Sequence, residues 1–132
     1  MTVDIRKKIL IVDDEIPVGK SIRMALARED YEIDLALSGE EAMKKEGEKA
    51  YDVIIADLMM PGLNGLDLLK ALKAKASRAP FIMITGYPTM KNTLQAMQIG
   101  AFDFLPKPFL PSELRNLVSR ALAAGEKTRG SG

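Results

Sequence analysis

One stretch of the sequence, from Tyr51 to Gly65, constrains the fold more than any other. It begins with the apolar run VIIA, which polar residues flank and which ends on a single aspartate, Asp57. Such a run is typical of a strand buried on both faces of a parallel sheet, and the PGLNG that follows predicts a loop. Ligands of open α/β sheets bind beyond the carboxyl ends of the strands, so Asp57 occupies a position suited to chemistry. On this stretch alone, an aspartate that merely caps a strand is an equal alternative.

Four other segments also predict strands, residues 31–37 by their alternation of polar and apolar side chains, and predicted helices separate all five. The predicted strands are residues 7–12, 31–37, 53–56, 81–84 and 102–105. Five strands that alternate with five helices predict a parallel sheet with helices on both faces, because right-handed crossover connections place the helices there.

Apolar side chains at helical spacing support each predicted helix. In chain order they are Val18, Ile22, Ala25 and Leu26; Ala42 and Met43; Leu68, Leu69 and Leu72; Met90, Leu94 and Met97; and Leu114, Leu117, Val118, Ala121 and Leu122. Ser38 and Glu41 predict a capping box at the start of the second helix. Gly100 is expected to close the fourth helix in a left-handed conformation. We expect Phe102, Phe104 and the methionines to lie in or near the core.

The composition excludes several classes of function. The 132 residues suit one domain with a substantial core, and the net charge of +1, without a local Lys/Arg cluster, gives no basis for binding nucleic acid. The chain has no cysteine, which removes thiolate chemistry and is compatible with a reducing cytoplasm. It has no histidine, so any imidazole in a mechanism must come from a partner. No apolar run approaches the roughly 20 residues that span a membrane. We therefore expect a cytoplasmic protein without a membrane segment.

The polar ends of the chain suggest its boundaries. Residues 1–6 read as a polar lead-in, and residues 7–124 as the domain itself. The sequence GEKTRGSG at residues 125–132 is polar and rich in glycine, which indicates a linker or a remnant of cloning.

Polar residues follow four of the predicted strands: Asp13 and Asp14, Asp57, Thr85, and Lys107. All five should line one crevice. Two unit charges about 4 Å apart at an effective dielectric near 20 repel by roughly 4 kcal/mol, so either one carboxylate is protonated or a cation lies among them. Oxygen ligands without histidine or cysteine favour Mg²⁺ or Mn²⁺ over zinc. The hydroxyl and the ammonium group could bind a phosphoryl group, so the cluster suggests a phosphoryl-transfer site.

Four motifs, each at a predicted strand end, together resemble those of response-regulator receiver domains. They are IVDDE at residues 11–15, DLMMPGLNG at 57–65, ITG at 84–86 and LPKPF at 105–109. The resemblance covers about residues 7–124. It implies a flavodoxin-like, doubly wound sheet of five parallel strands in the order 2-1-3-4-5.

The resemblance also implies a role for each site residue. Asp57 would be the phosphoacceptor. Asp14, Asp57 and the Met59 carbonyl would ligate Mg²⁺ directly, and Asp13 would act through water. Thr85 and Lys107 would bind the phosphoryl group, and the Lys107–Pro108 bond would be cis. Thr85 and Phe104 would change conformation on phosphorylation and so act as the switch residues.

A receiver of this kind is a signalling protein rather than an enzyme. It would take its phosphoryl group from a sensor histidine kinase or a phosphotransfer protein. The fourth helix, fifth strand and fifth helix would then repack to control an effector domain, and this face could form a homodimer. Residues 84–88 and 102–109 look similar to receivers of enhancer-binding transcription regulators, which suggests a transcriptional output. The domain itself is not expected to bind DNA.

Two positions depart from common choices in that family. Met59 and Tyr87 stand where a hydrolytic water would approach, and neither side chain can orient that water well. They predict a long-lived phosphorylated state.

Other interpretations remain open at this stage. Each motif alone has a simpler explanation: an acidic helix cap for residues 13–15, a turn at Thr85 and a solvated loop lysine at Lys107. An aspartyl-nucleophile phosphatase would need a carboxylate where Met59 stands. A flavin carrier would need a Ser/Thr-rich phosphate loop where residues 13–15 are acidic. A receiver-like interaction module that works without phosphorylation is the main alternative.

Overall fold

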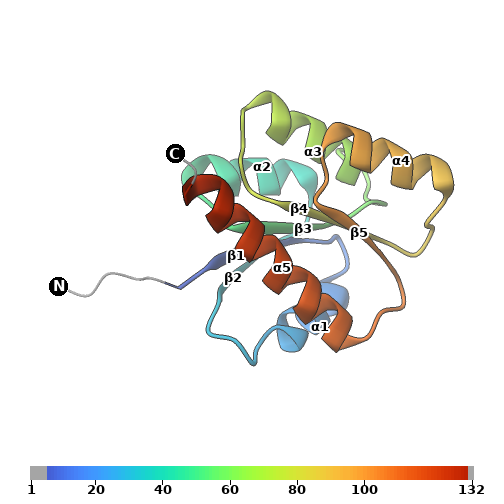
Figure 1. The fold of residues 1–132 in the computed structure, drawn as a ribbon. Helices are drawn as coiled ribbons and strands as arrows, with labels where there is room; N and C mark the ends of the chain where they lie inside the picture. Colours follow the sequence, from blue (N-terminus) through green and yellow to red (C-terminus); the bar gives the residue numbers. More distant parts are fainter. Residues whose placement is uncertain (1–5, 131–132) are drawn as a thin grey trace.

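Five parallel strands form one sheet in the computed structural model, which describes residues 6–130 (Figure 1). The strands are β1 (Lys8–Val12), β2 (Glu32–Ala36), β3 (Val53–Asp57), β4 (Phe81–Thr85) and β5 (Asp103–Pro106). Their order in the sheet is β2-β1-β3-β4-β5, and every neighbouring pair is parallel. The predicted flavodoxin-like topology is therefore confirmed.

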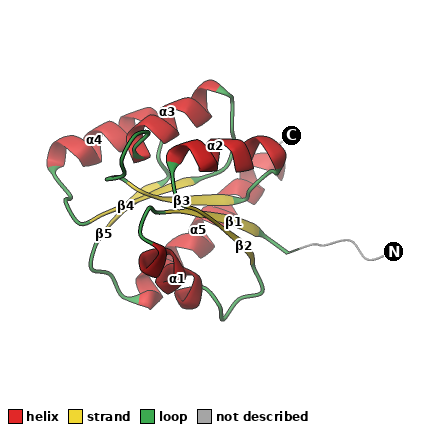
Figure 2. Ribbon diagram, turned by 180° about the vertical axis from the view of Figure 1, so that it is seen from behind, coloured by secondary structure: helices red, strands yellow, loops and turns green. Residues whose placement is uncertain are grey.

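Helices cover both faces of this sheet. They are α1 (Ile16–Ala25), α2 (Gly39–Glu48), α3 (Gly65–Ala74), α4 (Met90–Ile99) and α5 (Pro111–Gly130). Seen from behind, α2, α3 and α4 lie on one face and α1 and α5 on the other (Figure 2). Two hydrophobic clusters correspond to these faces. Ile54 on β3 belongs to the first and Ile55 to the second, because successive side chains of a strand point to opposite faces.

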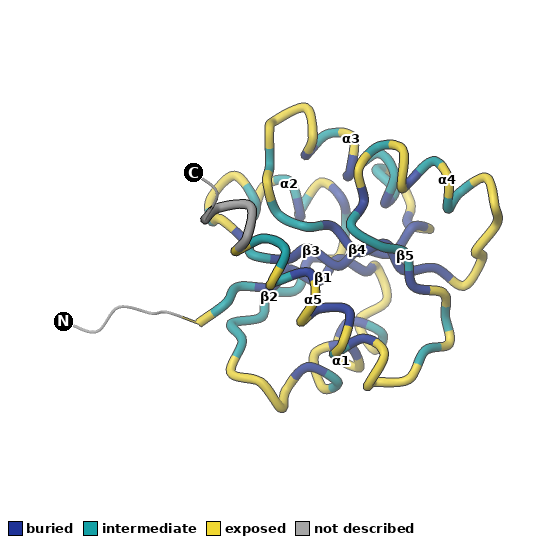
Figure 3. The backbone as a smooth tube through the Cα atoms, in the orientation of Figure 1, coloured by how far each residue is buried: buried dark blue, intermediate teal, exposed yellow. Residues whose placement is uncertain are grey.

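The central strand β3 is buried along its whole length. Ile54 and Ile55 are at most 1% exposed, and full burial of such a side chain contributes about 1.5–3 kcal/mol. Asp57 therefore ends a strand that lies in the buried centre of the sheet, and Figure 3 colours the backbone by burial.

The N-terminus of α2 agrees only in part with the predicted capping box. The Ser38 hydroxyl accepts a hydrogen bond from the Glu41 N–H at 3.0 Å, as expected. The Glu41 carboxylate, however, accepts from the N–H of Leu37 and not from that of Ser38. The complete reciprocal box is at α3 instead, where Asn64 and Asp67 exchange side-chain and backbone hydrogen bonds.

The prediction that the methionines lie in or near the core is only partly correct. Met60 and Met83 are buried, but Met24, Met59, Met90 and Met97 are exposed. On α4, only Ala96 is buried, and Leu94 is exposed with its methionine neighbours. The apolar stripe on α4 correctly indicates a helix but faces away from the sheet. Phe102 and Phe104 are partly buried against the two clusters, as expected.

The C-terminal ends of α4 and α5 can be compared with the predictions for Gly100 and for residues 125–132. Gly100 ends α4 with a positive φ of +122°, and a Cβ there would come within 2.9 Å of the Lys73 side chain. Helix α5 continues to Gly130, so the backbone stays helical through most of the segment read as a linker.

Residues 1–5 and 131–132, which belong to the predicted lead-in and tail, lie outside the described residues. Within residues 6–130, no helix has the length and apolar character needed to cross a membrane.

A polar cluster supports the edge strand β2. The Asp34 carboxylate accepts hydrogen bonds from the Tyr51 hydroxyl at 2.7 Å and from Lys49 Nζ at 3.1 Å. Burial acts to raise the pKa of Asp34, but these bonds outweigh it and hold the pKa below 3.8. A depressed carboxyl pKa contributes stability above the unfolded-state pKa, and this contribution is lost as the pH falls through the folded-state value.

We therefore expect Asp34→Asn to lower the free energy of unfolding by about 1 kcal/mol at pH 7, since the variant loses a charge-assisted pair that is partly exposed. Below the pKa of Asp34, the wild-type side chain is also neutral, and the difference should vanish. Urea unfolding at a series of decreasing pH values measures this. A difference that is constant over the whole range would contradict the account.

Candidate functional site

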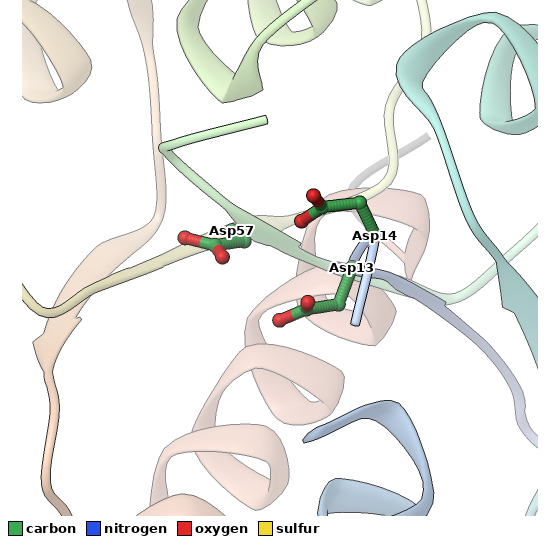
Figure 4. Close-up of side chains that lie close together, drawn as sticks. All are labelled: Asp13, Asp14 and Asp57. Atoms are coloured by element: carbon green, nitrogen blue, oxygen red, sulfur yellow. The ribbon is translucent and has the colours of Figure 1, made fainter. Parts of the chain in front are cut away.

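Three carboxylates meet where β1 and β3 end. Asp13 and Asp14 directly follow β1, and Asp57 is the last residue of β3, its neighbour in the sheet. One oxygen from each side chain lies within 4.8 Å of the others, and Figure 4 shows the three carboxylates gathered in one region. Because the strands are parallel and adjacent, their carboxyl ends bring together residues that are 44 positions apart in the sequence (57 minus 13).

The cluster is largely enclosed. Asp13 is 3% exposed and Asp57 is 7% exposed, whereas Asp14 is exposed to solvent. Burial raises the pKa of Asp13, and the neighbouring charges of Asp57 and Asp14 raise it further. The Glu15 N–H, which donates to Asp13 Oδ1 at 2.9 Å, and the Lys107 ammonium act in the opposite direction but do not cancel the effect on the pKa. Burial is therefore the main reason why the pKa of Asp13 is raised, and the two neighbouring carboxylates add to it.

Lys107 supplies the nearest positive charge. Its Nζ lies 3.4 Å from Asp57 Oδ2 and 3.6 Å from Asp13 Oδ2. The loop after β5 places it there: its N–H donates to the Thr85 carbonyl at 2.7 Å, and the Lys107–Pro108 bond is cis, as expected. One ammonium group thus faces two buried carboxylates.

Thr85 ends β4 and completes the predicted set. The register pairs Asp57 with Ile84, so Thr85 lies one residue beyond the aspartate on the neighbouring strand. Its side chain is fully buried, and the hydroxyl accepts a hydrogen bond from the Tyr87 N–H at 3.0 Å. The next strand carries Phe104 opposite Met83, partly buried against the core.

The donor set fits a hard divalent cation. It consists of carboxylate oxygens, with no histidine or cysteine in the whole chain, and oxygen is the ligand that Mg²⁺ and Mn²⁺ prefer. A bound cation would also offset the repulsion that Asp57 and Asp14 exert on the ionised Asp13. The Met59 backbone adjoins the cluster, because its N–H donates to Asp57 Oδ1 at 3.2 Å.

Gly65 also shapes the site, although its sequence context predicts only a turn. A Cβ at this position would lie 2.6 Å from the Asp57 carbonyl oxygen and 2.7 Å from Met83 Sδ. The start of α3 can therefore approach the end of β3 only because this residue is glycine. Its position in NGLD signals a turn, but the contact depends on the packing of two elements, which the sequence pattern does not show.

The fold and this site define the class of protein. A family model for the response regulator receiver domain matches residues 9–119. The chain therefore belongs to the response-regulator receiver family, whose members are signalling proteins of two-component systems.

Individual relatives agree with this assignment. The transcriptional regulatory protein ResD of Bacillus subtilis is 40% identical over 92% of the chain, which spans 50% of that protein. The regulatory protein AtoC of Escherichia coli is 36% identical over 87% of the chain, which spans 25% of it. A CheY-like receiver domain of Methanospirillum hungatei has a TM-score of 0.88 at 28% identity and covers 93% of this chain and 98% of its own. The chain thus spans half or less of these curated relatives but nearly all of the solved receiver domain.

Proposed function

We propose that this chain accepts a phosphoryl group on Asp57 from a phosphohistidine of a partner protein, and so acts as the receiver of a two-component response regulator. The contact that carries the proposal is the one between Lys107 Nζ and Asp57 Oδ2, at 3.4 Å, in a carboxylate cluster of which Asp13 and Asp57 are buried. A carboxylate is a suitable nucleophile for this transfer, and the ammonium group beside Asp57 can bind the incoming phosphoryl oxygens.

The transfer step uses groups of this chain and of the donor. A carboxylate oxygen of Asp57 attacks phosphorus in line, the phosphorus–nitrogen bond to the donor imidazole breaks, and the imidazole leaves with the bonding electron pair. Asp14, Asp57 and the Met59 carbonyl would hold Mg²⁺, with Asp13 acting through water. When bound, the ion reduces the repulsion between the phosphoryl group and the carboxylates.

The signal follows from what the phosphoryl group adds. It brings about two negative charges and three acceptor oxygens. Lys107 pairs with one oxygen, and the Thr85 hydroxyl turns from its contact with Tyr87 toward another. Phe104 then moves into the space that Thr85 leaves, and α4, β5 and α5 repack.

The proposed partners rest on the family and on the relatives, of which the chain spans half or less. A sensor histidine kinase or a phosphotransfer protein would supply the phosphoryl group. An effector domain in a longer chain would receive the signal, and its output would be transcriptional if this chain functions like the transcriptional regulatory protein ResD. The α4-β5-α5 face could also form a homodimer. The chain would act in the cytoplasm, as a phosphoacceptor with only slow self-catalysed phosphotransfer and dephosphorylation.

Intact-mass measurement tests the proposal. The wild-type protein is incubated with Mg²⁺ and phosphoramidate, and again with EDTA in place of Mg²⁺. We expect the mass of one phosphoryl group to appear only with the metal. A protein that gains no mass with any small amidophosphate or acyl phosphate would instead support an interaction module that works without phosphorylation.

The side chains of Met59 and Tyr87 predict a slow loss of the phosphoryl group. Both are exposed, at 57% and 70%, and neither offers a carboxylate or amide to orient an attacking water. We expect the double variant Met59→Asn with Tyr87→Ala to shorten the phosphate half-life by about tenfold, within the range for a positioned polar group. Half-lives are measured by mass after removal of the donor, with Met24→Asn as an exposed control. An unchanged half-life would contradict the prediction.

A further inference from the structure

The loop between β3 and α3, residues 58–64, carries the Met59 carbonyl that the proposed metal site requires. Its two ends are well held. The Leu58 N–H donates to the Ile84 carbonyl at 2.8 Å, the Gly65 N–H donates to the Leu58 carbonyl at 3.0 Å, and the Met60 side chain is buried. The outer part has less support, because Met59 and residues 61–62 are exposed.

Glu40, in the first turn of α2, holds that outer part from another element. Its Oε1 accepts a hydrogen bond from the Leu63 N–H at 2.9 Å, between residues 23 positions apart. The carboxylate also lies against Gly62, where φ is +70° and a Cβ would come within 3.0 Å of Oε1. Gly39 adjoins the same segment so closely that a Cβ there would collide with the Leu63 carbonyl oxygen. The start of α2 and the outer loop therefore form one packed unit.

The hydrogen bond between Glu40 and Leu63 can affect metal binding because the same loop contains the Met59 carbonyl. Leu63 is four positions after Met59 (63 minus 59), so the hydrogen bond that holds Leu63 limits the conformations of the backbone between them. Mg²⁺ demands near-ideal octahedral geometry and tolerates little displacement of a ligand. We infer that Glu40 is a positioning residue for the metal site: through Leu63 it fixes the loop that presents the Met59 carbonyl. This inference rests on the proposed function.

Glu40 could also act through its negative charge alone, which would attract a cation without any effect on the loop. Two conservative variants separate these causes. Glu40→Gln removes the charge and keeps an oxygen at the same reach. Glu40→Asp keeps the charge, but its side chain is one methylene shorter and does not reach the Leu63 N–H. Glu48→Ala, at the exposed end of the same helix, is the control for loss of an acidic residue from α2.

The experiment is a calorimetric titration of each protein with MgCl₂, without a phosphodonor. We expect Glu40→Ala and Glu40→Asp to weaken Mg²⁺ binding by about tenfold, the lower end of the effect of residues that orient metal ligands. Glu40→Gln and Glu48→Ala should stay within about twofold of the wild type, because neither loses the Leu63 bond. Urea unfolding without Mg²⁺ shows whether each variant is folded, and the Gln and Asp pair decides the matter even if the Ala variant is unstable.

The opposite ranking would overturn the inference. If Glu40→Gln binds Mg²⁺ as weakly as Glu40→Ala while Glu40→Asp binds normally, the charge and not the loop contact is responsible. If all three Glu40 variants bind like the wild type, the contact does not position a ligand. A wild-type protein that binds no Mg²⁺ would contradict the proposed function itself, a different result from either of these.

Discussion

An Asp57→Asn variant is expected to gain no phosphoryl group under conditions in which the wild-type protein is fully modified. The substitution preserves shape in a site where Asp57 is 7% exposed, so the surrounding packing should remain. It removes the carboxylate, and an amide oxygen is too weak a nucleophile to attack phosphorus. We expect the rate of modification with Mg²⁺ and phosphoramidate to fall by at least about 1,000-fold, as for other residues that carry a reaction directly.

The control for this variant is Asp30→Asn, which makes the same chemical change at an exposed position outside the site. It should be phosphorylated like the wild type. Intact mass measures the extent of modification, and peptide mapping after borohydride reduction of the acyl phosphate locates it. Phosphorylation of Asp57→Asn at the wild-type rate would show that another residue is the acceptor.

The second large effect is expected from the double variant Asp13→Asn with Asp14→Asn. These side chains supply two of the three carboxylates within 4.8 Å of one another, so their loss should weaken Mg²⁺ binding by more than about 100-fold. Without Mg²⁺, the same change should raise the free energy of unfolding by about 0.5–2 kcal/mol, because it removes like charges from an enclosed site. Binding and stability are thus expected to change in opposite directions.

The raised pKa of Asp13 gives the sign of this stability change. Burial and the neighbouring carboxylates make its ionised form less favourable in the folded protein than in the unfolded chain. Folding therefore loses stability as the pH rises from the unfolded-state pKa to the folded-state pKa. Urea unfolding at pH 7, with and without Mg²⁺, measures both effects. A double variant that is less stable than the wild type without metal, although folded, would contradict the electrostatic explanation.

Much of the site could be predicted because parallel strands share one carboxyl edge. Asp13, Asp57 and Thr85 each follow an apolar run, and the alternation of runs and helices leaves little freedom in where those ends lie. The sequence pattern predicted the buried face of α3 and of α5 but not that of α4. Met90, Leu94 and Met97 have the spacing of a buried stripe, yet α4 buries only Ala96 against its neighbours.

The sequence pattern also could not predict contacts between segments that are distant in the chain. The hydrogen bond from the Leu63 N–H to Glu40 depends on how the start of α2 packs against the loop between β3 and α3. The close approach at Gly65 depends on the distance between α3 and the end of β3. Both are properties of the assembled fold, and periodicity along the chain carries no information about them.

The central claim is that Asp57, Lys107, Thr85 and a divalent cation together bind a phosphoryl group. A crystal structure of the chain with Mg²⁺ and beryllofluoride tests it most directly, because beryllofluoride imitates a phosphoryl group on a carboxylate. We predict beryllofluoride on an Asp57 oxygen, within bonding distance of Lys107 Nζ and the Thr85 hydroxyl, and Mg²⁺ on Asp14, Asp57 and the Met59 carbonyl. A structure with neither beryllofluoride nor Mg²⁺ bound at this cluster, although both are present at saturating concentration, would contradict the account.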